Sequence, residues 1–144
     1  MTTLTEIRKA VRTALRQAYP KANIYGVDTL EGYKKPSFFV YVTQTFSEAT
    51  ANAVHKNVEI EIDYIQKSPN EFEALEFFDK MESLFCHKLK TEHRQLTTDN
   101  LNSYFDGENM NIPCFSFEVE FWSAIDKKDN SALMGELHLK QEVN

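Results

Sequence analysis

The stretch VEIEIDYIQKSPNEFEALEFFDKMESLF, residues 58–85, contains both periodicities on which the fold depends. Residues 58–65 alternate between apolar and acidic side chains, which is the pattern of a β-strand with one face on a core. The apolar set is Val58, Ile60, Ile62 and Tyr64, and the opposite set is Glu59, Glu61 and Asp63. The stretch therefore predicts a strand with an acidic outer face.

A helix is predicted directly after this strand. Ser68 has the position of an N-cap, Pro69 that of the first helical turn, and Glu71 follows the cap by three residues. We expect this helix to run to about Leu89. Its apolar side chains form two stripes: Phe72, Leu75, Phe78 and Phe85 in one, and Ala74, Phe77, Met81 and Leu84 in the other. One stripe is predicted to pack on a sheet, and the other to be covered by residues 91–112 or by a neighbouring molecule.

The part of the chain before this stretch predicts a helix, a loop and a strand. Residues 4–19 have apolar positions at helical spacing, Thr3 and Glu6 form a capping box, and Pro20 ends the helix. Residues 38–46 read as a strand whose pattern allows both faces to be covered. Residues 47–57 read as a polar loop.

The part after residue 90 adds further strands. The segments RQLTT and NSYFDGENM suggest short strands or a hairpin around Asp106 and Gly107, and residues 113–125 form a long strand. Its inward side chains are Phe115, Phe117, Val119 and Phe121. Residues 130–144 alternate weakly, as an edge strand or an arm would. This order predicts one α+β domain over residues 1–144, a mainly antiparallel sheet with two helices packed on it.

Composition limits the classes of function. The formal charge of −6 argues against non-specific binding to nucleic acid. We find no run long and apolar enough for a membrane span and no signal-peptide order at the start, so we expect a protein made and kept in a cytoplasm. Cys86 and Cys114 lie in apolar runs and are expected to be reduced and buried.

The sequence offers no recognisable catalytic motif. It lacks a glycine-rich phosphate loop, a serine nucleophile elbow and zinc-ligand spacing. Cys86 and His87 are consecutive on a predicted helix and would diverge by about 100°. His87 and His93 could share a metal only if the end of the helix folded back, and His55 and His138 have no ligand spacing. We predict no catalytic residue, no metal and no cofactor.

Charged side chains form two groups that remain open to interpretation. Neighbouring strands would place five acids on one sheet face: Glu59, Glu61, Asp63, Glu118 and Glu120. Three interpretations of this face are open. It is an ordinary solvated surface, or it is a site for a cation or for acid/base chemistry, or it contacts a basic partner or lines an acidic passage. The first helix carries a basic stripe, Arg8, Lys9, Arg12 and Arg16, which is either solvated or complementary to acid on another copy.

The segment between the first helix and the first long strand resembles a known family. A helix ending in AYP, followed by IYGVDTLEGYKKPSFFVYV, is similar to the start of the tail terminator, or tail completion, proteins of phages and prophages from Gram-positive bacteria, including those encoding phage-tail-like particles. The stretch SPNEFEALEFFDKMESLF resembles the second helix of the family. The strand from Cys114 to Ile125, followed by LMGELHLKQ, resembles its C-terminal part. The polar run TTDNLNS, within residues 91–112, has no counterpart in this resemblance.

The resemblance implies a structural role in the virion. Such proteins form a ring, usually of six, on the head-proximal end of the tail tube, where the ring ends polymerisation and offers a docking surface to the neck or head. The implied partners are other copies of the chain, the tail tube protein, a neck or head-completion protein, and a sheath if the tail is contractile, with DNA only as passing cargo and no membrane. Assembly in the bacterial cytoplasm is expected.

Within this picture, residues 27–35 read as a solvent-projecting lobe that contacts a neighbour or the tube. Gly26 and Gly32 would give the lobe its backbone freedom, and Tyr33, Lys34 and Lys35 are its candidate contact residues. Two alternatives stay open: a head-completion or neck connector protein that binds the portal side, and a small enzyme or ligand-binding domain.

Overall fold

The computed structural model describes residues 1–125. The chain is an α+β protein, and its elements follow in the order α1 (Leu4–Ala18), β1 (Asn23–Tyr25), β2 (Ser37–Ala49), β3 (Ala53–Ile65), α2 (Glu71–Phe85), β4 (Lys88–Lys90), β5 (Gln95–Asp106) and β6 (Ile112–Ala124). The predicted order of helix, three strands, helix and up to three strands is confirmed. The proposed strand or arm at residues 130–144 lies outside the described residues.

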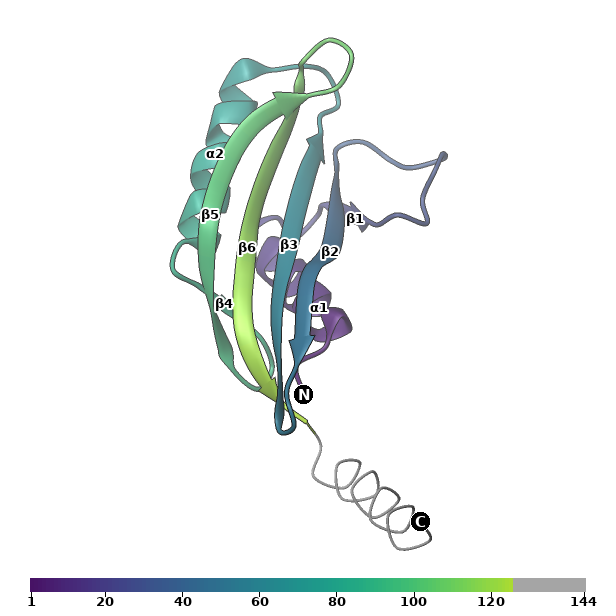
Figure 1. The fold of residues 1–144 in the computed structure, drawn as a ribbon. Coiled ribbons are helices and arrows are strands. Elements are labelled where there is room, and N and C mark those ends of the chain that lie inside the picture. The colour runs from purple at the N-terminus through teal and green to yellow at the C-terminus, as the bar shows by residue number, and fades with distance from the viewer. Residues whose placement is uncertain (126–144) are drawn as a thin grey trace, which may run out of the picture.

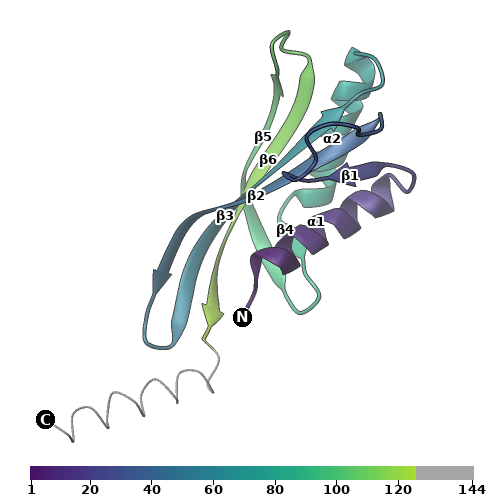
Figure 2. The ribbon, with the colours of Figure 1, turned by 90° about the vertical axis from the view of Figure 1, so that its right-hand side faces the viewer.

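The strands form one curled sheet with the order β1-β2-β3-β6-β5-β4. Every neighbouring pair is antiparallel except β1 and β2, which are parallel. Figure 1 shows the long central strands side by side, and Figure 2 shows that α1 and α2 cover the same face of the sheet. The other face carries no helix within residues 1–125, and we call it the outer face.

Helix α1 forms where its sequence pattern predicts. Thr3 is in an extended conformation, and its hydroxyl accepts a hydrogen bond from the backbone N–H of Glu6 at 3.2 Å. The buried side chains are Ile7, Ala10, Val11 and Leu15. Their spacing places all of them on the side that packs against the sheet.

Strands β2 and β3 are longer than predicted. Residues 47–57, expected to be a polar loop, instead extend both strands to a short turn between Ala49 and Ala53. Only the first residues of β2, from Ser37 to Val40, are buried on both faces, while residues 43–49 are exposed on both. The far half of this hairpin therefore projects beyond the helices (Figure 2). The polar composition of residues 47–57 was a poor predictor of a loop. A strand that is exposed on both faces needs no apolar side chains, so its sequence looks like that of a loop.

Helix α2 begins and ends within the predicted range. Its N-cap is Asn70, whose side chain accepts a hydrogen bond from Glu73 N–H at 3.2 Å, and not Ser68. It ends at Phe85 instead of Leu89, because His87 has a φ of 73° and Lys88 enters strand β4. Cys86, expected to be buried, is half-buried at this turn, whereas Cys114 is buried, and both are free thiols.

The two apolar stripes of α2 have different environments. Phe77 and Met81 are fully buried, and Phe78 packs edge-on against Phe105 of β5 at 5.3 Å between ring centroids. Residues 91–112 thus cover part of the stripe that contains Phe78, which is one of the two covers predicted for it. Phe72 and Leu75 remain 81% and 46% exposed, so the cover is incomplete.

Strands β5 and β6 form the second long hairpin. The segments RQLTT and NSYFD, expected to be separate short strands, belong to one strand, β5, that is interrupted by an irregularity between Asp99 and Asn102. Asn100 has a φ of 51° there. The turn around Asp106 and Gly107 is confirmed, with Gly107 at a φ of 91°.

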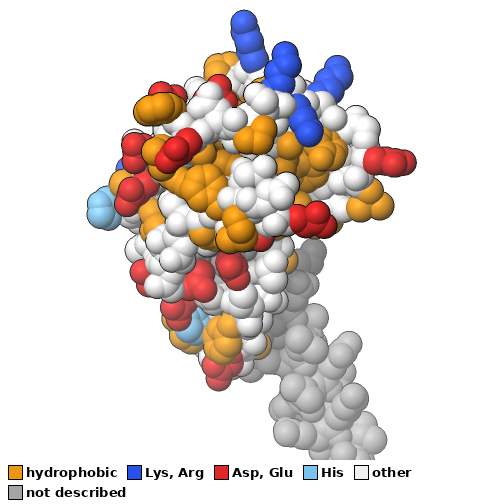
Figure 3. All heavy atoms as spheres, turned by 90° about the horizontal axis from the view of Figure 1, so that it is seen from above, with side chains coloured by type: hydrophobic (Ala, Val, Ile, Leu, Met, Phe, Trp, Pro, Cys, Tyr) orange, Lys and Arg blue, Asp and Glu red, His pale blue; other side chains and the backbone are white. Residues whose placement is uncertain are grey.

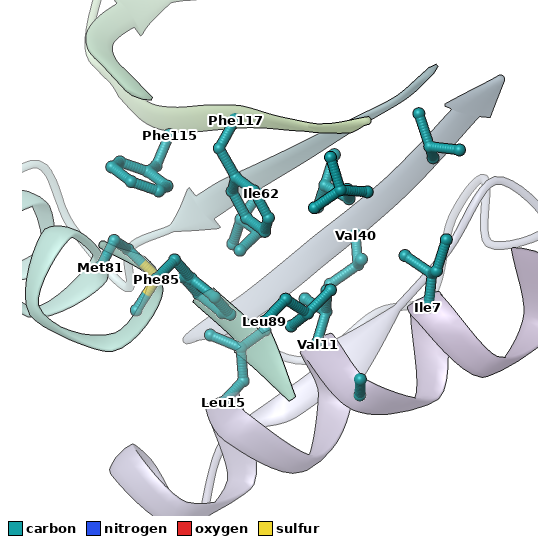
Figure 4. Close-up of a cluster of buried hydrophobic side chains, with 14 of the residues drawn as sticks. Ile7, Val11, Leu15, Val40, Ile62, Met81, Phe85, Leu89, Phe115 and Phe117 are labelled. Carbon is teal, nitrogen blue, oxygen red and sulfur yellow. The ribbon is translucent and has the colours of Figure 1, made fainter. Parts of the chain in front are cut away.

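One core joins both helices to the sheet. Figure 4 shows Val11 and Leu15 of α1 and Met81 and Phe85 of α2 on the same side of the strands, with Leu89 of β4 between the two helices. Phe85 stacks on Phe117 with ring centroids 4.8 Å apart. The four inward residues predicted for β6, Phe115, Phe117, Val119 and Phe121, are all buried. This packing fixes which side chains of β3 and β6 face outward.

Candidate functional site

The outer face carries the predicted group of acids, which we call the acidic face: Glu59, Glu61 and Asp63 on β3, and Glu118 and Glu120 on β6. The two strands are neighbours, and Glu59 is directly opposite Glu118. Glu61 is opposite Ser116, and Asp63 is opposite Cys114. The structure therefore brings the five acids together on one surface, in two adjacent rows.

Neutral and aromatic side chains hold three of these acids within the chain. The hydroxyl of Tyr104 donates a hydrogen bond to Oε1 of Glu61, and the side-chain amide of Asn100 donates one to Glu118 at 2.6 Å. His55 Nε2 lies 2.7 Å from Oε1 of Glu120 and stacks on Trp122 at 4.5 Å between ring centroids. These contacts of Tyr104, Asn100 and His55 depend on the registers of β3, β5 and β6, so no local sequence pattern predicts them.

Asp63 is the most perturbed acid of this face. The pKa of Asp63 is raised to about 6, chiefly by burial; a hydrogen bond with the thiol of Cys114 opposes the rise, and the charges of Glu61 and Asp106 contribute to it. One carboxylate oxygen of Asp63 is buried without a hydrogen-bond partner. Its position explains this, because Asp63 is opposite Phe39, at the aromatic end of the outer face.

The basic stripe lies on α1, on the helix-covered side of the sheet. Lys9, Arg12 and Arg16 are exposed. Arg8 is half-buried, and its guanidinium turns toward the following loop, 2.9 Å from the point that a Cβ at Gly26 would occupy. Gly26 therefore provides room for Arg8, whereas Gly32, with a φ of 76°, provides backbone freedom.

The loop of residues 27–35 projects at its tip and is packed at its end. Val27 and Leu30 are largely exposed, and Figure 1 shows the loop standing away from the sheet beside β1. Tyr33 returns to the outer face and packs edge-on against Phe39 at 5.1 Å. The backbone N–H of Lys34 donates a hydrogen bond to the hydroxyl of Tyr25 at 3.2 Å. Lys34 and Lys35 are thereby held exposed at the edge of the sheet.

The acidic face and the basic stripe do not neutralise each other within the chain. Among residues 1–125, the ion pairs within 4.0 Å involve only histidine, so no lysine or arginine pairs with a carboxylate at that distance. Helix α1 lies on one face of the sheet (Figure 2), and the five acids are on the outer face, so the sheet separates the two groups. Seen from above, lysine and arginine side chains gather along one margin of the molecule, with apolar side chains in the middle (Figure 3).

The candidate sites for chemistry do not assemble into a centre. Within residues 1–125, no three histidine, cysteine or carboxylate side chains are placed to hold a metal ion. His87 and His93 are both exposed, and His138 lies outside the described residues. No helix in the same part of the chain is long and apolar enough to cross a membrane.

Comparisons with known proteins show the family of the chain. The sequence profile of a family described as "Phage tail terminator protein" matches residues 6–131. A search among curated proteins finds no match. One solved structure of similar fold has a TM-score of 0.51 and 12% sequence identity, over 88% of this chain and 98% of the other, which shows likeness of fold alone. Because the profile spans most of the sequence, the chain belongs to the phage tail terminator protein family and has a structural role in a phage tail.

Proposed function

We propose that this chain forms a homo-oligomeric ring, of six copies as the resemblance implies, that caps the head-proximal end of the tail tube. The ring ends tube polymerisation and provides the docking surface for the neck or head. The observation that carries the proposal is the separation of charge. Five acids lie on one side of the sheet and the basic stripe lies on the other. Within residues 1–125, no lysine or arginine pairs with a carboxylate within 4.0 Å.

In this proposal the acidic face lines the channel of the ring. DNA phosphates passing through the channel would meet carboxylates, which do not bind them. An acidic wall thus lets the cargo move, whereas a basic wall would retain it. The role also gives a reason to keep Glu59 opposite Glu118, an arrangement that costs stability in a monomer.

The basic stripe then faces away from the channel. Arg12 and Arg16, with Lys9 beside them, are available to acidic surfaces of a neighbouring copy or of the tail tube protein. Tyr33, Lys34 and Lys35 present a second contact at the sheet edge. The remaining partners are a neck or head-completion protein and, in a contractile tail, the sheath. We propose no catalytic role and no cofactor, a Gram-positive host, and assembly in the bacterial cytoplasm.

Two measurements test the proposal. Native mass spectrometry of the protein, alone and mixed with tail tube, should give a closed ring, whose copy number the mass states directly. A deletion strain should assemble tails that are abnormally long or fail to join heads. Tails of normal length joined to heads would contradict the capping role. Joined heads with only the tail length altered would limit the role to ending the tube.

A further inference from the structure

Both edges of the sheet are left largely uncovered in the described part of the chain. Strand β1 pairs with β2 only from Ser37 to Phe39, so that the edge of β2 from Val40 to Ala49 has no neighbour within residues 1–125. Strand β4 pairs with β5 only from Gln95 to Thr97, and the backbone N–H of Thr98 still donates a hydrogen bond to the carbonyl of His87 at 3.1 Å. The edge of β5 from Asp99 to Asp106 therefore has no neighbouring strand within residues 1–125. An uncovered edge presents unpaired backbone N–H and C=O groups and is a template for another strand.

The edge of β2 lacks most of the usual protection. Residues 40–47 contain no charged side chain and no proline, and its one irregularity lies between Gln44 and Phe46. Natural edge strands of this length normally carry lysine, proline or a cover to prevent association. Beside this edge, Phe46 remains 42% exposed.

We propose that the β2 edge of one copy pairs with the β5 edge of a second copy, so that the sheets of neighbouring copies join in the ring. This inference rests on the ring of the proposed function. Three alternating antiparallel steps separate β2 from β5, so the two edge strands run in opposite directions. Two copies placed side by side in the same orientation therefore bring β2 and β5 together as an antiparallel pair.

The two uncovered edges also lie at the same level of the sheet. Following the registers across the sheet, Val40 is level with Ser103, and Gln44 is level with Thr98. Copies can thus pair Val40–Thr43 with Asp99–Ser103 without sliding along the strands, with the irregularity of β5 between Asp99 and Asn102 inside the pair. Figure 1 shows β5 bowed outward at this height. The contact is head-to-tail and closes into a ring when each copy is rotated against the next.

Charge favours a second copy as the occupant of the edge. Following the registers, Phe39 is level with Tyr104. Strand β2 begins two residues before Phe39, at Ser37, and β5 ends two residues after Tyr104, at Asp106, so the start of β2 and the end of β5 lie at the same end of the sheet. Because β1 occupies the edge of β2 from Ser37 to Phe39, the next copy's β5 would leave the pair after Ser103. Its exposed Asp106 and Glu108 would then lie at the same end of the sheet as the exposed Lys34 and Lys35. Joined this way, all copies turn their acidic faces to the same side.

Disulfide trapping tests the pairing. Thr43 and Asp99 are both exposed, and the registers place them in one row of the outer face. We would combine Thr43→Cys with Asp99→Cys in a chain that also carries Cys86→Ser, and oxidise the assembled ring, in isolation or on tube ends. The expected result is a ladder of covalent multimers up to the full ring, because opposed positions of an antiparallel pair reach disulfide distance.

The matched control combines Thr43→Cys with Glu92→Cys, since Glu92 is an exposed acid outside the uncovered edge. It should give no ladder. A ring of normal mass that yields no ladder with the Thr43–Asp99 pair would overturn the edge pairing and leave the proposed function standing. Absence of a ring under every condition, tube included, would overturn both. Hydrogen exchange gives an independent measurement. Within residues 40–43, the alternate amides that point away from β3 should become protected on assembly, and they stay unprotected if the edge remains open.

Discussion

Glu59 on β3 and Glu118 on β6 lie directly opposite each other at the centre of the acidic face. Asn100 donates a hydrogen bond to Glu118, and among residues 1–125 neither carboxylate pairs with a lysine or arginine within 4.0 Å. Like charges in this position repel, so the pair weakens the fold of the monomer. Under the proposed function, the two carboxylates serve in the assembled ring, where they form part of the channel wall.

Removing one of these charges should stabilise the monomer. Glu59→Gln is expected to raise the free energy of unfolding by about 0.2 to 1 kcal/mol, the usual range for a cross-strand pair. Urea unfolding at low salt measures the change, and high salt should reduce it. Glu48→Gln, on an exposed part of β2, serves as the control. A loss of stability in Glu59→Gln would show that repulsion between Glu59 and Glu118 does not destabilise the monomer.

Truncation within α2 should separate core packing from assembly. Phe77 is fully buried and packs on Tyr64 and Phe38, with ring centroids at 5.3 and 5.8 Å, and Met81 is equally buried. Replacing either by alanine should cost about 2 to 5 kcal/mol of unfolding free energy. Phe72→Ala, on the exposed side of the same helix, should change it by less than about 0.5 kcal/mol. An unchanged melting temperature for Phe77→Ala would contradict the packing described.

The elevated pKa of Asp63 predicts a particular pH dependence. The folded state holds the proton of Asp63 up to about pH 6, whereas the unfolded chain releases it near the ordinary carboxyl value of about 4. The contribution to stability is therefore complete below pH 4 and is lost as the pH rises through 6. Wild-type protein should lose stability relative to Asp63→Asn over this window. Parallel stability curves for the two proteins between pH 4 and 7 would refute the shift.

Charge reversal on α1 should affect association and not folding. Replacing Arg12 and Arg16 by glutamate is expected to weaken ring or tube association by up to about 2 kcal/mol per interface, since each exposed pair contributes about 0 to 1 kcal/mol. Analytical ultracentrifugation at low salt measures the association, and circular dichroism checks the fold. Lys67→Glu with Lys80→Glu makes the same change in net charge elsewhere and should leave association intact. Equal effects from the two double variants would point to net charge alone.

The elements with strong local signals were predictable from the sequence. The helical spacing of apolar residues in α1, the alternation of residues 58–65 and the aromatic alternation of β6 each fix a backbone period and an inward face, and all three are confirmed. Because the outward face of a strand follows from its inward face, the five acids could be assigned to one surface before β3 and β6 were known to be neighbours. The single-domain prediction and the roles of the charged groups remain predictions.

Other features depended on contacts between distant segments. Three residues of β1 become a strand only because β2 lies parallel to them, and α2 stops at Phe85 because the next residues pair with β5. Such short pieces carry too few residues to show a period of their own. The contact of Tyr104 with Glu61 likewise spans an intervening strand, and it follows from register alone. Local sequence thus determined the faces of the long elements, whereas the ends of elements, the edges of the sheet and the neighbours of each acid were decided by tertiary packing, since hydrogen bonds between strands join residues that are distant in sequence.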